Sequence, residues 1–152
     1  MKKNIDKLTE SEFEELLLTF MVGVYVRSGV LDSQGKNWKE VDDQLKFFLQ
    51  LAEGLGFRKL VEHYNKDVLP NEKLCKQEEK IMEDYNEDEF WNTLEIYLGQ
   101  RDFFENATND DLEQLKKDFW LPDIVDKYYK KYEKEFMKHG INRLQIVNKV
   151  KK

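Results

Sequence analysis

The chain has 152 residues, a formal net charge of −6 and a single cysteine. The lone Cys75 excludes an intramolecular disulfide and any metal site built from several cysteine ligands. The acidic balance argues against general nucleic-acid binding, which needs a basic face. A chain of this length and hydrophobic content predicts one folded domain over residues 1–152.

Two features of the sequence bear on targeting to a membrane or out of the cell. The first residues lack the apolar core of a signal peptide. The most apolar stretch, Leu16 to Val26, covers 11 residues, whereas a membrane span needs roughly 18 or more. Together with the unpaired thiol, these features predict a cytoplasmic protein that does not contact a membrane.

A helix is predicted to begin at a capping box formed by Thr9 and Glu12. Apolar residues then recur at helical spacing, at Phe13, Leu16, Leu17, Phe20 and Val24. The later turns are apolar on all sides, which favours a position at the centre of the fold. We expect this helix to end near Ser28 and Gly29.

Three further features complete the first half of the chain. A second helix is predicted from Asn37 to the glycines at 54 and 56, and a short third helix over 57–65. Pro70 then enforces a break. The region 66–71 is therefore the candidate boundary between subdomains.

The second half also has helical spacing. We expect a charged helix over 71–85, a helix capped by Asn86 or Asp88, and a short helix after a cap-rich turn at 108–111. A last helix is predicted from Pro122 to His139, followed by a basic tail over 141–152. With no convincing strand, the chain is predicted to be an all-α, compact, single-domain bundle of six to eight helices with short connections.

Two pairs of carboxylates stand out by their spacing. Glu12 and Glu15 lie on the first predicted helix, and Glu40 and Asp43 on the second. Oxygen ligands on facing helices suit magnesium with a bound triphosphate. The arrangement resembles the E-x-x-E and E-x-x-D pattern of MazG-type nucleotide pyrophosphatases, a resemblance that implies a magnesium-dependent hydrolase. Acidic residues also favour the first turn of any helix, and we prefer that structural interpretation.

Four residues are candidates for binding. Arg101 lies inside an apolar stripe, where a buried guanidinium has to pair with a carboxylate or an anion. Two of them, Trp38 and Trp120, lie at the edges of predicted helices, and Tyr129 lies on the last predicted helix, which carries tyrosines on more than one side. Tryptophan and tyrosine side chains often anchor protein interfaces. The same aromatic residues also serve as core, so both interpretations stay open.

Apart from this carboxylate pattern, no motif for nucleophilic catalysis, phosphate binding or metal ligation occurs in the sequence. We therefore predict no cofactor and a non-catalytic cytosolic interaction domain, such as an adaptor, inhibitor or immunity-type protein. Its partner is expected to be another protein or a second copy of itself. The alternatives are the magnesium-dependent hydrolase and, last, a DNA mimic that uses the acidic block from Glu78 to Glu95.

Overall fold

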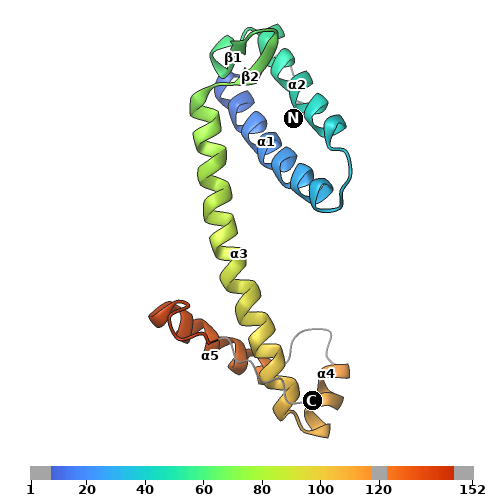
Figure 1. The fold of residues 1–152 in the computed structure, drawn as a ribbon, viewed down its shortest axis with the longest axis vertical. Helices are drawn as coiled ribbons and strands as arrows, with labels where there is room; N and C mark the ends of the chain where they lie inside the picture. Colours follow the sequence, from blue (N-terminus) through green and yellow to red (C-terminus); the bar gives the residue numbers. More distant parts are fainter. Residues whose placement is uncertain (1–7, 118–122, 146–152) are drawn as a thin grey trace. The chain divides into compact units, whose positions relative to one another are not determined.

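The computed structural model describes residues 8–117 and 123–145 (Figure 1). Within this part the chain is mostly helical, which confirms the predicted class, but it has five helices and a two-stranded hairpin rather than six to eight helices. The elements are α1 (Glu10–Ser33), α2 (Lys39–Gly54), β1 (Val61–Tyr64), β2 (Asp67–Pro70), α3 (Glu72–Asn106), α4 (Asn109–Lys117) and α5 (Asp123–His139), with a 3₁₀ turn over Arg58–Leu60.

The internal contacts divide the chain into two compact units, residues 1–84 and residues 85–152. The division falls inside α3, so the first turns of α3 belong to the first unit and its remaining turns to the second. Each unit has its own buried residues.

The start of α1 confirms the predicted capping box. The Thr9 hydroxyl accepts a hydrogen bond from the Glu12 amide at 3.3 Å, and the Glu12 carboxylate accepts one from the Thr9 amide at 3.0 Å. The predicted end at Ser28 and Gly29 is wrong, because α1 continues to Ser33. Gly35, with φ of 64°, follows the actual end and adopts the left-handed conformation that glycine tolerates.

The predicted third helix over 57–65 is wrong. Its residues form the 3₁₀ turn and then strand β1, which pairs with β2 in antiparallel register from Val61–Pro70 to Tyr64–Asp67. Asn65 lies in the two-residue turn with φ of 56°, a conformation that asparagine adopts more readily than most residues. The apolar spacing at Phe57, Leu60 and Val61 imitates a helix, and only the turn at Asn65 distinguishes the two structures.

The two helices expected over 71–85 and from 86 onward are one continuous helix, α3. Neither Asn86 nor Asp88 acts as a cap, since both lie inside α3 and neither residue type by itself ends a helix. Pairs of side chains one turn apart support the helix across this region: Lys80 with Asp84 at 2.7 Å, and Asn92 with Asp88 at 3.0 Å. The break at Pro70 is confirmed, because α3 begins two residues later.

The core of the first unit lies between α1, α2, the hairpin and the start of α3. In Figure 1, α1 and α2 run side by side and the hairpin lies at one end of them. The buried cluster consists of Phe13, Leu17, Leu18, Met21, Leu49, Ala52, Leu60, Val61 and Leu74. These residues come from α1, α2, the 3₁₀ turn, β1 and the start of α3, and the partly buried Val68 of β2 packs against them, so the helices and the hairpin share one core.

The second unit packs α5 against the later turns of α3. Phe103, Val125 and Phe136 are buried there, and the rings of Trp91 and Phe136 lie 5.5 Å apart. The cap-rich turn before α4 is confirmed by reciprocal hydrogen bonds between Thr108 and Asp111. The end of α5 at His139 is confirmed as well, whereas the predicted start at Pro122 lies outside the described residues.

Candidate functional site

Helix α1 is apolar on all sides but is buried on only one. Phe13, Leu17, Leu18 and Met21 belong to the core, whereas Leu16, Val26 and Val30 are 52%, 42% and 50% exposed. The expectation that the whole helix lies at the centre of the fold is therefore wrong. Exposed Leu16, Thr19, Gly23, Val26 and Val30 share one side of the helix, which we call the free face of α1.

The length and apolar composition of α1 also reach those of a membrane-crossing helix. Core helices of soluble proteins pass the same test, but they are mostly buried, and only 17% of the relevant stretch of α1 is buried. The four core residues of α1 nevertheless hold it against α2 and α3 in the first unit. Helix α1 is therefore packed in the core on one side and carries exposed apolar side chains on the other.

A groove of about 590 Å³ runs between α1 and α2, beside the free face. Its lining is apolar, and the rings of Phe20 and Phe48 stack in it with centroids 4.2 Å apart. Arg27 also lines the groove and donates to the Gln44 side chain at 3.1 Å. A second hollow of about 430 Å³ shares Phe20 and Phe48 and is lined by the carboxylates of Glu40 and Asp43. This part of the surface suits an apolar binding partner.

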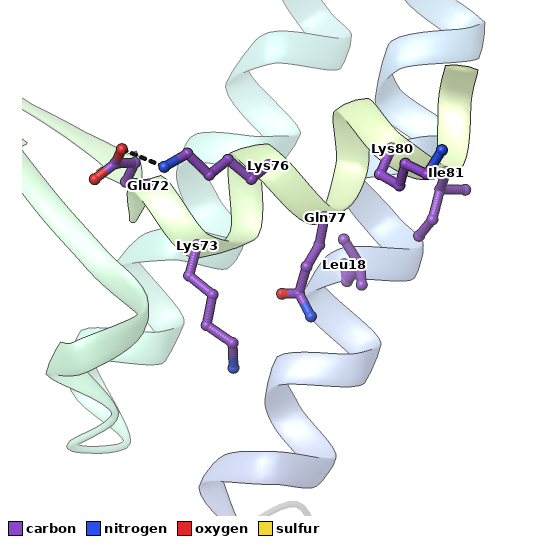
Figure 2. A pocket seen from close by; sticks show the side chains of 7 residues that line it. All are labelled: Leu18, Glu72, Lys73, Lys76, Gln77, Lys80 and Ile81. Carbon is purple, nitrogen blue, oxygen red and sulfur yellow. Dashed lines mark ion pairs between the residues drawn. The ribbon is translucent and has the colours of Figure 1, made fainter. Parts of the chain in front are cut away.

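A third hollow, of about 620 Å³, lies where α3 passes α1 (Figure 2). Leu18 of α1 and Ile81 of α3 give it an apolar base, and Gln77 lies beside Leu18 in Figure 2. Each of its three lysines already pairs with a carboxylate: Lys73 with Glu14, Lys76 with Glu72 at 2.7 Å, and Lys80 with Asp84 at 2.7 Å. The lysines are neutralised within the chain, which argues against an anion site.

The second unit contains a charged network around Asp102, which is only 8% exposed. Its carboxylate accepts hydrogen bonds from Arg101 at 2.7 Å, Lys131 at 2.6 Å and the Tyr132 hydroxyl at 2.7 Å. Burial by itself raises the pKa of Asp102, but the hydrogen bonds from Lys131, Tyr132 and Arg101 outweigh it and hold the pKa well below its usual range. This network joins α3 to α5.

The sequence-predicted binding residues are scattered. Arg101 is not buried, because its side chain is 54% exposed, and it pairs with Asp102 within the chain. Trp38 is exposed before α2 and lines a shallow hollow with Tyr25 and Glu78. Tyr129 is half-buried with its ring against Gly99, and its buried hydroxyl has no partner among the described residues. Trp120 lies outside the described residues.

The four carboxylates proposed for magnesium are not brought together. Glu12 is engaged in the capping box, and Glu15 is exposed about one turn further along α1. Only Glu40 and Asp43 line a common hollow. Among the described residues, no group of three or more histidine, cysteine, aspartate or glutamate side chains is arranged to hold a metal ion.

The sequence reasoning missed the free face of α1 and the central role of Asp102. For the first, the sequence shows only that the later turns of α1 are apolar on every side, which does not distinguish the buried side from the free one. The signal for the second was an acid next to Arg101 inside an aromatic stripe. In comparisons with protein-family models, curated proteins and solved structures, nothing matches this chain.

Proposed function

We propose that this protein is a non-catalytic interaction domain that binds another protein surface through the free face of α1 and the adjoining α1–α2 groove. The observation that supports the proposal is the exposure of Leu16, Val26 and Val30 on a helix whose opposite side is packed in the core. Contiguous exposed apolar residues beside an apolar groove are typical of binding surfaces.

The polar chemistry of the surface supports the same function. The Thr19 hydroxyl donates to the Glu15 carbonyl at 2.9 Å, so it is already satisfied within α1. Gly23 adds no side chain, and the guanidinium of Arg27 is held by Gln44. A partner that covers these residues therefore leaves few unsatisfied polar groups buried.

Photocrosslinking of the full chain in its native cell tests the proposal. With a photoreactive phenylalanine analogue in place of Val26, we expect one discrete protein adduct, which Val30→Lys prevents. The same analogue at exposed, polar Gln50 of α2 is the matched control and is expected to give no adduct. An absent adduct, or one that forms equally at both positions, contradicts the proposed function.

A further inference from the structure

The spacing along the free face of α1 is that of a paired helix. Leu16, Thr19, Gly23, Val26 and Val30 follow one another at intervals of three, four, three and four residues. This is the repeat at which side chains of two helices interlock over a long contact. From Leu16 to Val30, which is about 21 Å along the helix, none of these five positions carries a charge.

Packing among the described residues does not explain the glycine in the middle of this face. A β-carbon added at Gly23 would meet no atom within 4 Å, so packing in the first unit does not require glycine there. Glycine weakens a helix interior relative to alanine. Because Thr19 and Gly23 are small, the backbone of a second helix can come close to α1 at these positions. A second helix whose contacting residues follow the same spacing can keep this contact along the whole face.

The charges on α1 favour one orientation of such a helix. Glu12 and Glu15 lie at the start of the free face, and Arg27 lies beside its later half. A second α1 that runs antiparallel brings the acidic end of each copy beside Arg27 of the other. A parallel copy would bring the acidic ends together, which is unfavourable.

We propose that the free face of α1 is covered by α1 of a second copy of this chain, in an antiparallel, two-fold symmetric homodimer. The register that places Glu15 opposite the second copy's Arg27 also places Leu16 opposite its Val26 and Thr19 opposite its Gly23. This inference rests on the proposed function and identifies its partner. A two-fold contact uses the same surface on both copies, as the single continuous face of α1 allows.

Light scattering coupled to size exclusion tests the assembly with the full chain. The expected mass is twice the chain mass of 18.4 kDa. Val26→Asp is expected to raise the dimer dissociation constant at least about tenfold, because it places a charge in the contact. Gln50→Asp, on the polar side of α2, is the matched control and is expected to leave the dimer intact, with circular dichroism checking the fold of both variants.

Disulfide trapping tests the orientation. Leu16→Cys and Val26→Cys are made separately in a Cys75→Ser background. An antiparallel pair predicts that oxidation links the two variants efficiently only when they are mixed. If each variant instead links efficiently to a second copy of itself, and the two variants do not link to each other when mixed, the antiparallel arrangement is overturned.

The remaining outcomes separate the two proposals. A monomer at all concentrations, with a Val26 adduct to a different protein, overturns the homodimer and leaves the interaction function standing. A monomer with no adduct overturns both. A monomer that floats with phosphatidylcholine–phosphatidylserine vesicles, and loses that property in Val26→Asp, also overturns both, since the apolar face then serves a lipid surface.

Discussion

Two glycines in helices illustrate how differently the same residue acts in this protein. Gly99 of α3 lies directly under the Tyr129 ring, and a β-carbon there would come within 2.8 Å of Tyr129 Cε1. Gly29 of α1 has nothing within 4 Å of that position. One glycine therefore permits a close helix contact, and the other only weakens its helix.

The first prediction follows from this difference. Gly99→Ala is expected to lower the free energy of unfolding by about 1–3 kcal/mol, because the added methyl forces the Tyr129 ring out of place. Gly29→Ala, the matched control, is expected to raise it by up to ~1 kcal/mol through helix propensity. Denaturant unfolding followed by circular dichroism measures both, and equal effects would show that the Gly99–Tyr129 contact is absent.

Asp102 gives a second prediction, in its pH dependence. Its pKa is lowered in the folded chain, so its contribution to stability is complete above the ordinary aspartate pKa of about 3.9 and is lost as the pH falls toward the folded pKa. Asp102→Asn is expected to be less stable than the wild type at pH 7. The gap between the two should narrow progressively below about pH 4.

Urea unfolding at a series of pH values measures this gap. Glu113→Gln on α4 serves as the control, because it removes a carboxylate from an exposed ion pair with Lys116. Exposed pairs contribute little, so its stability is expected to follow that of the wild type. A gap for Asp102→Asn that stays constant in acid would contradict a lowered pKa at this residue.

At the scale of elements, Asn71 joins the start of α3 to the segment that precedes the hairpin. Its side-chain oxygen accepts from the Leu74 amide at 2.8 Å, as a helix cap does, and its side-chain amide donates to the Lys59 carbonyl at 2.6 Å. Its backbone amide donates to the Leu60 carbonyl at 3.0 Å. The residue after Pro70 therefore sets both where α3 begins and how the 3₁₀ turn is held.

Asn71 provides a third prediction. Asn71→Ala removes the cap and the Lys59 contact and is expected to cost about 1–2 kcal/mol. Asn71→Asp keeps the cap oxygen and loses only the donor, so its cost should be smaller. Thermal unfolding compares the three proteins, and an Asp variant as unstable as the Ala variant would show that the cap contributes nothing.

At the scale of the whole molecule, the two units have separate sets of buried residues. Asn71 acts in the first unit and Gly99 in the second. Distant substitutions with no shared contacts have additive effects on stability. We expect Asn71→Ala to increase amide exchange mainly within residues 10–84, and Gly99→Ala mainly within residues 90–139. Hydrogen exchange read by mass spectrometry measures this, and exchange that rises equally in both ranges for either variant would contradict separate units.

The local elements were predictable from sequence where a short-range interaction determines them. The Thr9–Glu12 box, the break at Pro70 and the turn at Thr108 each depend on residues within a few positions of one another, and each is confirmed. The hairpin and the continuity of α3 were not predicted. The local apolar spacing at 57–65 is that of a helix, whereas the turn at Asn65 lets residues 61–64 pair with residues 67–70 as strands.

The mainly helical character of this protein, and the positions where several helices begin and end, are predictable from the amino-acid sequence, because hydrophobic period and capping are local properties of the chain. Which side of α1 is buried and which is free depends instead on the tertiary structure. An all-round apolar helix carries no periodic asymmetry, so its exposed side depends on which neighbours the fold supplies. The same holds for Asp102, whose burial and partners Lys131 and Tyr132 come from packing α5 against α3.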